Sequence, residues 1–261
     1  MKIVIPMAGR GSRFQAQADR NPEYKKPKPI IDVKGYPMIR WATGSLPFIE
    51  HPGQSIDSAM AVKPHDLVFI IQKEHNENHN ICAVLKKHYG DDINIITLDG
   101  FTRGAAETAL KAKEFINKDE PIIITDSDHF LDGEAMAREI AANPGLDGLI
   151  PVFEVTDGNP KWSFSKLGAD GYVEEVAEKK PISDWANIGV YYFSSGKNFV
   201  EIAEDVIARE EYTNGEFYLA PLYNKIIEKG GKVKLAYPKY VHGLGTPEDL
   251  EWFIDNTNYN L

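Results

Sequence analysis

Two groups of residues in this 261-residue chain have the chemistry to bind phosphate. The first is a glycine loop, Met7-Ala8-Gly9-Arg10-Gly11-Ser12-Arg13, followed by a basic stretch that ends in Lys28-Pro29 and leads into Ile30-Ile31, expected to be a strand. Glycines let backbone N–H groups turn toward an oxyanion, and arginine and lysine bind phosphate oxygens. A single Gly-x-Gly is more often a plain surface turn. The combination with the basic stretch favours a phosphate site.

The second group is Thr125-Asp126-Ser127-Asp128-His129, which follows an apolar run. Two carboxylates two residues apart can hold a divalent cation carried by a polyphosphate, because Mg²⁺ needs only one or two protein carboxylates. An ordinary acidic turn is the alternative. We expect packing or hydrogen bonding from His129, because hard oxygen ligands suit this chemistry better.

Charge limits the class of ligand. The net charge is −10, yet residues 10–34 hold seven Lys/Arg and three Asp/Glu, so the positive charge is concentrated there. This pattern favours a small anionic ligand over nucleic acid or an anionic membrane. The single cysteine, Cys82, excludes an intrachain disulfide. No apolar run approaches the ~20 residues of a membrane span, and no signal peptide precedes the first strand. We therefore expect no membrane partner and a cytoplasmic location.

Strands and helices alternate in the first half of the sequence. Runs rich in Ile and Val predict buried strands at 2–6, 66–71, 93–97 and 121–125. Apolar residues at helical spacing predict helices at 36–49, 76–89 and 105–117. The alternation is typical of an α/β fold with a doubly wound, mostly parallel sheet. Ligands bind beyond the carboxyl ends of such strands, where both groups of residues would lie.

The second half has more turns. Strands are predicted at 147–153, 172–177, 187–193 and 232–237, helices at 197–209 and 216–229, and a loop at 50–64. Thr246-Pro247 is a typical start for the last helix. We expect a single domain, 1–261, with a nucleotide-binding half at about 1–145 and an acceptor-binding half at about 146–261.

The first group of residues resembles the signature of the sugar-phosphate nucleotidyltransferase (nucleotide-sugar pyrophosphorylase) family. The family pattern A-G-x-G-x-R, followed later by K-P, matches residues 8–13 and 28–29, and Pro37-Met38-Ile39 matches its first long helix. The resemblance covers nearly the whole chain and is closest to short bacterial members of capsule and surface-polysaccharide loci. It implies a Rossmann-like fold of the nucleotide-diphospho-sugar transferase type, with a smaller antiparallel sugar-binding portion.

The resemblance also implies which residues bind the nucleotide. The catalytic residues would be Arg13, Lys28 and Asp128. Residues Thr102–Thr108 resemble the family's base-recognition segment. Asp99, close to it in sequence, could accept a hydrogen bond from the amine of cytosine. This favours CTP, with UTP and dTTP as alternatives. The residues implied to bind the nucleotide are Met7, Ala8, Gly9, Gly11, Ser12, Arg13, Lys28, Asp99, Thr102, Gly104 and Ala105.

The acceptor site is implied by Glu178-Lys179-Lys180-Pro181, which resembles the family's E-K-P element. The extra lysine leaves open whether Lys179 or Lys180 binds the acceptor phosphate. The residues implied to bind the acceptor are Trp162, Glu178, Lys179, Lys180, Asn187, Gly189 and Glu216. Many members have a second metal-binding aspartate where this chain has Gly243, so Mg²⁺ would be bound by Asp128, with Asp126 or alone.

These features predict an enzyme that transfers a nucleoside monophosphate from a nucleoside triphosphate to a sugar phosphate, or a similar phosphorylated small molecule, and releases pyrophosphate. Family members are often dimers or tetramers, so we expect a homo-oligomer. A metal-dependent glycosyltransferase using Asp126 and Asp128 is the alternative, although it would not need Arg13 and Lys28 for a departing pyrophosphate. A third hypothesis is a nucleotide-binding regulator without activity.

Overall fold

A computed structural model describes residues 1–53, 55–56 and 58–261. Gln54 and Asp57, both in the predicted loop 50–64, lie outside the described residues. Contacts between Cα atoms divide the chain into two units. Unit 1 consists of Met1–Val4, Thr102–Thr125 and Glu134–Pro238, and unit 2 of Ile5–Phe101, Asp126–Gly133 and Lys239–Leu261. The division into halves near residue 145 stays a prediction.

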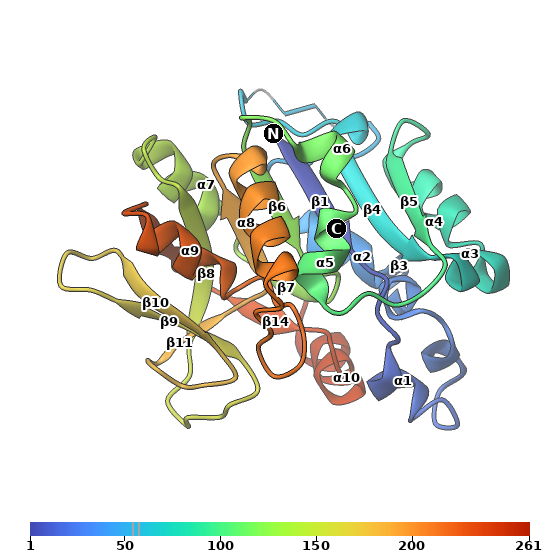
Figure 1. Cartoon of the computed structure of the whole chain (residues 1–261). Helices are drawn as coiled ribbons and strands as arrows, with labels where there is room; N and C mark the ends of the chain where they lie inside the picture. Colours follow the sequence, from blue (N-terminus) through green and yellow to red (C-terminus); the bar gives the residue numbers. More distant parts are fainter. Residues whose placement is uncertain (54, 57) are drawn as a thin grey trace. The chain divides into compact units, whose positions relative to one another are not determined.

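The strands of unit 1 form a mixed sheet (Figure 1). The strands are β1 (Lys2–Pro6), β6 (Ile122–Thr125), β8 (Gly148–Glu154), β9 (Ser163–Leu167), β10 (Val173–Glu178), β11 (Trp185–Asn187), β12 (Val190–Phe193) and β13 (Val233–Ala236). The first residues of β1 pair in parallel with β6, and β13 pairs in parallel with β8. β12 joins β6 to β8 with antiparallel pairing on both sides, and β11, β9 and β10 continue as an antiparallel extension.

Helices cover this sheet. They are α5 (Ala105–Leu110), α6 (Lys113–Ile116), α7 (Glu134–Ala142), α8 (Gly196–Ala208) and α9 (Leu222–Glu228). In Figure 1, α5, α6 and α8 lie on the same face of β6. The predicted helix 197–209 is confirmed, and Ser195 caps it by accepting a hydrogen bond from the Asn198 N–H. The predicted helix 105–117 is instead two short helices.

Unit 2 contains a parallel pair, β4 (Leu67–Gln72) and β5 (Asn94–Leu98), with Val68 opposite Asn94. All six residues of β4 are buried. The connection is helical, but the predicted helix 76–89 is wrong as a single element. It is divided into α3 (Lys73–His79) and α4 (Ile81–Tyr89) at Asn80, whose φ is +50°. Asparagine adopts this left-handed conformation more readily than most residues.

Short elements complete unit 2. They are α1 (Ser12–Gln15), the 3₁₀ helices η1 (Pro22–Lys25), η2 (Lys28–Ile30) and η3 (Pro64–Asp66), the strand pairs β2–β3 (Asp32–Val33, Tyr36–Pro37) and β7–β14 (His129–Leu131, Val241–Gly243), and the helices α2 (Met38–Gly44) and α10 (Pro247–Asn256). The predicted strand at Ile30-Ile31 is wrong. Pro29 in the first turn favours the 3₁₀ helix and removes an N–H that a strand would use.

An aromatic core holds these short elements of unit 2 together. Trp41 of α2 packs edge-on against Phe130 of β7 and Phe253 of α10, with ring centroids 5.3 Å and 5.1 Å away. The buried Phe14 of α1 joins the same core. The chain after the glycine loop and the chain around Asp128 are therefore anchored in one hydrophobic cluster.

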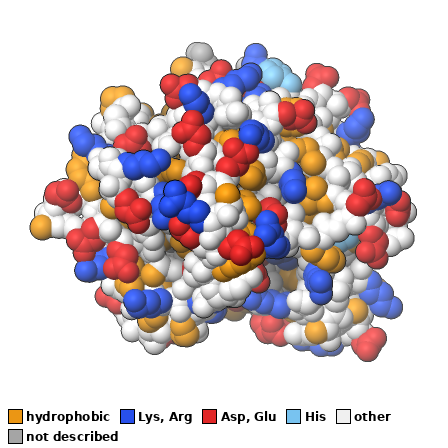
Figure 2. Space-filling view, in the orientation of Figure 1, with side chains coloured by type: hydrophobic (Ala, Val, Ile, Leu, Met, Phe, Trp, Pro, Cys, Tyr) orange, Lys and Arg blue, Asp and Glu red, His pale blue; other side chains and the backbone are white. Residues whose placement is uncertain are grey.

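The predicted fold class is confirmed: the chain forms a Rossmann-like α/β fold with a mostly parallel mixed sheet and a smaller antiparallel portion. Acidic and basic side chains are interspersed over the face shown in Figure 2. Over the described residues, no helix combines the length and the apolar character needed to span a bilayer.

Candidate active site

The glycine loop of unit 2 follows β1 and ends at α1. Gly11 has a φ of +65° and is the N-cap of α1, and its carbonyl accepts hydrogen bonds from the N–H groups of Phe14 and Gln15. A glycine is favoured here because L-residues with a side chain rarely adopt this backbone conformation. Gly9 is exposed, and a Cβ added to it would have no heavy atom within 4 Å. The loop therefore presents open backbone next to Arg13.

Gln72, the last residue of β4, holds the glycine loop through side-chain hydrogen bonds. Its side-chain Nε2 donates hydrogen bonds to the carbonyls of Ala8 (3.0 Å) and Gly100 (3.1 Å), and the side chain is buried. Met7 also donates its N–H to the carbonyl of Ile70 at 2.9 Å. The glycine loop and the chain next to Asp99 are thus held by one amide. Sequence reasoning missed Gln72, although a polar residue ending an apolar strand was the available signal.

Lys28 and Asp128 form an ion pair, although they are a hundred residues apart in sequence. Lys28 Nζ lies 2.7 Å from Asp128 Oδ2, and the two side chains are 28% and 22% exposed. Burial acts to raise the pKa of Asp128, but Lys28, with smaller contributions from His129 and Arg13, outweighs burial and holds that pKa below its usual value. The predicted catalytic residues Arg13, Lys28 and Asp128 therefore belong to one charged cluster in unit 2.

Gly245 makes room for this carboxylate. A Cβ on Gly245 would lie 2.5 Å from Asp128 Oδ2, closer than real Cβ contacts. The neighbouring Leu244 N–H donates a hydrogen bond to the Asp128 carbonyl at 2.7 Å. By contrast, the nearest atom to a Cβ on Gly243 would be Asp249 Oδ2 at 3.9 Å. The segment after β14 therefore shapes the position of Asp128 through its backbone.

Asp126 and Asp128 are the carboxylates expected to bind Mg²⁺. The described residues contain no group of three or more His, Cys, Asp or Glu side chains that could hold a metal by themselves. Mg²⁺ keeps several waters and phosphate oxygens and is often bound by one or two carboxylates, so the chemistry of Asp128, with Asp126 or alone, suits this ion, and its binding there stays a prediction. Burial lowers the pKa of His129 to about 4, which keeps that imidazole neutral. A neutral, buried His129 agrees with its expected structural role.

Asp99, the residue expected to recognise the base, is at the surface of unit 2. Its carboxylate is 82% exposed and lies 3.0 Å from Lys73 Nζ. A ligand that donates a hydrogen bond to Asp99 would therefore share this carboxylate with Lys73. Its role in base recognition stays a prediction.

The other part of the expected base-recognition segment belongs to unit 1 and packs against residues 212–217. Gly104 has a φ of +143°, and a Cβ on it would lie 2.4 Å from the carbonyl oxygen of Phe217. The Ala106 N–H donates to that same oxygen, and the Phe217 N–H donates to the Arg103 carbonyl, both at 2.9 Å. Glycine is therefore required at this position by the backbone of Phe217. Thr102 lies beside it and contacts Thr108.

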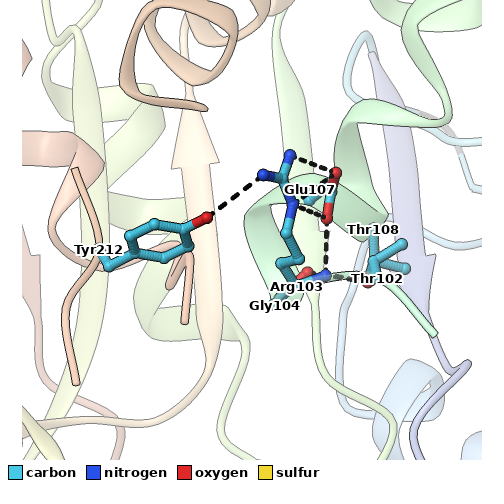
Figure 3. Close-up of polar contacts among 6 residues, drawn as sticks. All are labelled: Thr102, Arg103, Gly104, Glu107, Thr108 and Tyr212. Atoms are coloured by element: carbon cyan, nitrogen blue, oxygen red, sulfur yellow. Dashed lines mark hydrogen bonds and ion pairs between the residues drawn. The ribbon is translucent and has the colours of Figure 1, made fainter. Parts of the chain in front are cut away.

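Arg103 joins the two segments through its side chain, as Figure 3 shows. Its guanidinium donates to both carboxylate oxygens of Glu107, the shortest distance being 2.9 Å, and to the Tyr212 hydroxyl at 3.3 Å. The same group lies over the ring of Phe217, 5.0 Å from its centroid. The start of α5 is thereby held against the 212–217 segment by hydrogen bonds and by stacking.

Two predicted acceptor residues lie on one face of the antiparallel extension. Glu178 of β10 accepts a hydrogen bond from Ser163, and Asn187 of β11 accepts one from Ser165 at 2.7 Å. Ser163 and Ser165 are two residues apart on β9 and therefore point to the same face. Burial raises the pKa of Glu178. Asn187 is buried, and its Nδ2 has no hydrogen-bond partner among the described residues. This orphaned donor suits a ligand oxygen, since buried polar groups are normally paired.

Of the two lysines after Glu178, Lys179 is held in a defined position. Its φ is +54°, its N–H donates to the Trp162 carbonyl at 2.9 Å, and its Nζ donates to the Tyr218 hydroxyl at 2.7 Å. Lys180 is exposed. Trp162 itself packs edge-on against Phe153, 5.2 Å between ring centroids. These contacts bring Lys179 to the candidate acceptor residues of unit 1.

Gly189 and Glu216, also predicted for the acceptor site, are in turns of unit 1. Gly189 has a φ of +96° between β11 and β12 and interrupts the predicted strand 187–193. Glu216 closes a turn with Thr213 through two backbone hydrogen bonds of 3.0 Å, with Asn214 and Gly215 at positive φ. This turn takes up the first residue of the predicted helix 216–229, and the observed helix begins only at Leu222.

The chain is similar to proteins of known family and known structure. The family model described as nucleotidyl transferase matches residues 29–249, a stretch that begins just after Lys28. The crystal structure of the nucleoside-diphosphate-sugar pyrophosphorylase from Vibrio cholerae RC9 is 26% identical, has a TM-score of 0.73, and aligns over 97% of this chain and 100% of that chain. The inositol-1-phosphate CTP transferase from T. maritima is 12% identical with a TM-score of 0.70 over 99% of this chain and 98% of that chain, a similarity of fold. No curated protein matches the chain in a sequence search.

Proposed function

Because this chain belongs to the nucleotidyl transferase family, we propose that it transfers a nucleoside monophosphate from a nucleoside triphosphate to a sugar phosphate or similar phosphorylated small molecule. Pyrophosphate is the second product. The observation that carries the proposal is the Lys28–Asp128 ion pair beside the open glycine loop. A cation for phosphate oxygens and a carboxylate for a divalent metal are what a leaving pyrophosphate requires.

The proposed reaction is a single in-line displacement. An oxygen of the acceptor phosphate attacks the α-phosphorus, a new phosphorus–oxygen bond forms, and the bond to the β-phosphate oxygen breaks with its electron pair on pyrophosphate. Such reactions depend on positioning and charge neutralisation rather than on a protein nucleophile. Lys28 and Arg13 would neutralise charge on the leaving group. Mg²⁺, held by Asp128 with Asp126, would add charge neutralisation on the triphosphate oxygens.

The acceptor would bind to the face of β10, β9 and β11. Glu178 and the unpaired amide of Asn187 suit hydroxyl groups, because one accepts and the other donates hydrogen bonds. Lys179 would bind the acceptor phosphate, since its Nζ is already held by the hydroxyl of Tyr218, two residues from Glu216. We propose CTP as the nucleotide on the basis of Asp99, and a cytoplasmic, homo-oligomeric enzyme of surface-polysaccharide precursor synthesis on the basis of the family resemblance.

The test is a matrix of CTP, UTP, dTTP, ATP and GTP against phosphorylated acceptors, with Mg²⁺ and continuous detection of pyrophosphate. Pyrophosphate must appear only when a triphosphate and an acceptor are both present. A glycosyltransferase would release a nucleoside phosphate from a nucleotide sugar and no pyrophosphate. No pyrophosphate from any pair would contradict the proposal.

The Lys28→Ala variant tests the role of the ion pair. We expect at least a hundredfold loss of kcat/KM with the fold intact by circular dichroism, in the range of the loss of one preorganised charge contact, about 10²–10³. The matched control is Lys26→Ala, because Lys26 pairs with Glu23 at 2.5 Å instead. An unchanged rate of pyrophosphate release by Lys28→Ala would contradict the proposed function.

A further inference from the structure

Unit 2 contains a basic pocket whose lining residues have no assigned role in the proposed reaction. Its volume is about 540 Å³, within the roughly 300–1,000 Å³ of small-molecule sites. The glycine loop, η1, α3 and the end of the 99–101 segment all contribute to its lining. The lining residues used below are Arg10, Lys25, Pro27, His75, His79 and Phe101.

The pocket carries positive charge without internal compensation. Arg10 and Lys25 are exposed cations, and within the described part of the chain neither side chain takes part in an ion pair. Glu74 is the acidic residue in the lining, so the charge of the pocket is positive in a chain whose net charge is −10. Unpaired cations in a concave surface favour an anionic ligand, because the surrounding walls concentrate the field.

Two further side chains suit a phosphorylated ligand. His75 has a buried Nδ1 without a hydrogen-bond partner in the described residues, and burial lowers the pKa of His75, which favours the neutral ring with one N–H donor. Phe101 is 53% exposed, and the Arg10 guanidinium lies 4.4 Å from its ring centroid. This stacking holds the arginine in place while its N–H groups stay available.

The charged cluster proposed to bind the triphosphate does not line this pocket. Arg13, Lys28 and Asp128 are not among its lining residues. Arg10, which the sequence placed in the same glycine loop as Arg13, is instead stacked on Phe101. The loop thus presents its two arginines to different neighbours, Arg13 to Asp128 and Arg10 to this pocket.

We propose that this pocket is a second binding site, specific for phosphate-bearing small molecules. Arg10 and Lys25 bind the phosphate oxygens, His75 donates a hydrogen bond, and the body of the ligand lies against Phe101 and Pro27. Occupancy would fix Arg10 and with it the conformation of the glycine loop. The site does not depend on the reaction proposed above.

The test is isothermal titration of the full chain with inorganic pyrophosphate. Wild-type protein should bind two equivalents per chain. The Arg10→Ser/Lys25→Ser variant should bind one, and the second equivalent should weaken at least tenfold. Lys87→Ser, which removes an exposed cation on α4 outside the pocket, should still bind two equivalents. Circular dichroism and thermal melting confirm that each variant is folded.

The Lys28→Ala variant separates the two sites. It should keep the equivalent that depends on Arg10 and Lys25 and weaken the other. One equivalent in wild type, weakened both by Lys28→Ala and by Arg10→Ser/Lys25→Ser, would overturn the proposal and place Arg10 in the triphosphate site. Two equivalents of which neither depends on Lys28 would contradict the proposed function and leave the pocket supported.

Discussion

The Asp128 carboxylate lies directly against the backbone of Gly245, so that a Cβ on this glycine would stand 2.5 Å from Oδ2. The same oxygen accepts a hydrogen bond from Lys28 Nζ, 2.7 Å away. A side chain at position 245 would therefore push the carboxylate away from its cation. The position of Asp128, the proposed metal ligand, therefore depends on the lack of a side chain at residue 245.

We expect Gly245→Ala to lower kcat about tenfold to hundredfold, since misplacement of a reacting group by about 1 Å can cost 10²-fold. Initial rates of pyrophosphate release measure the effect. Gly243→Ala is the matched control, two residues away, because its Cβ would have 3.9 Å to the nearest atom. Equal activity of the two variants would refute the importance of this contact.

Gln72→Leu should weaken nucleotide binding. The substitution leaves the carbonyls of Ala8 and Gly100 without their amide donor, and an unpaired buried group costs about 1–3 kcal/mol. We expect a severalfold higher KM for the triphosphate, an unchanged KM for the acceptor, and a lower free energy of unfolding in urea. Gln17→Leu, which removes two exposed hydrogen bonds, one to Glu248 and one from Arg20, should change the free energy of unfolding by about 0.5 kcal/mol or less. Equal KM values for the triphosphate in both variants would contradict the role of the Gln72 hydrogen bonds in positioning the glycine loop.

The two lysines after Glu178 can be distinguished by Lys179→Met and Lys180→Met. The first variant loses the ammonium held at Tyr218, and we expect at least a tenfold higher KM for the acceptor with little change for the triphosphate. The second should stay within about threefold of wild type, as expected for an exposed lysine. The reverse order of effects would assign the acceptor phosphate to Lys180.

Acid should destabilise the protein through His51. Burial, helped by the positive charge of Arg40, lowers the pKa of His51 to about 3 in the folded state, against about 6.5 in an unfolded chain. Because the folded pKa lies below the unfolded one, this contribution to stability is complete above about pH 6.5 and is lost as the pH falls toward 3. The loss is about 1.4 kcal/mol per pH unit well below 6.5.

Urea unfolding at pH 7.5, 6 and 5 measures this contribution. The free energy of unfolding of His51→Gln should fall less steeply with pH than that of wild type. His65→Gln, at an exposed histidine, should follow the wild-type slope. Identical slopes for wild type and His51→Gln would show that His51 does not contribute.

The sequence predicted elements best where burial determines the pattern. The apolar runs at 2–6, 66–71 and 121–125 are strands because both faces of these strands are covered, which requires continuous Ile and Val. Breaks were missed where one residue changes the backbone locally. Asn80 interrupts a helical pattern that remains apolar on one face. Strand β9 was missed because Ser163–Leu167 has little apolar character.

The sequence suggests the residue types of the candidate site but only part of its geometry. Lys28 and Asp128 were chosen separately from their neighbours in sequence, and their ion pair arises from tertiary structure. Gln72 and Tyr218 belong to no sequence motif, so they were not predicted. Each holds a candidate residue in place: Gln72 binds the Ala8 carbonyl, and Tyr218 binds the Lys179 ammonium. Spacing in sequence carries no information about such supporting contacts.

The close packing of Gly104 against Phe217 has a consequence for protein engineering. A change of acceptor specificity by exchange of residues 212–218 with a homologous loop would alter the backbone that Gly104 and Ala106 rest on. The exchanged loop would then need the 102–107 segment from the same donor, including the partner of Arg103. Residues 102–107 and 212–218 are therefore one module for transplantation, although more than a hundred residues of sequence separate them.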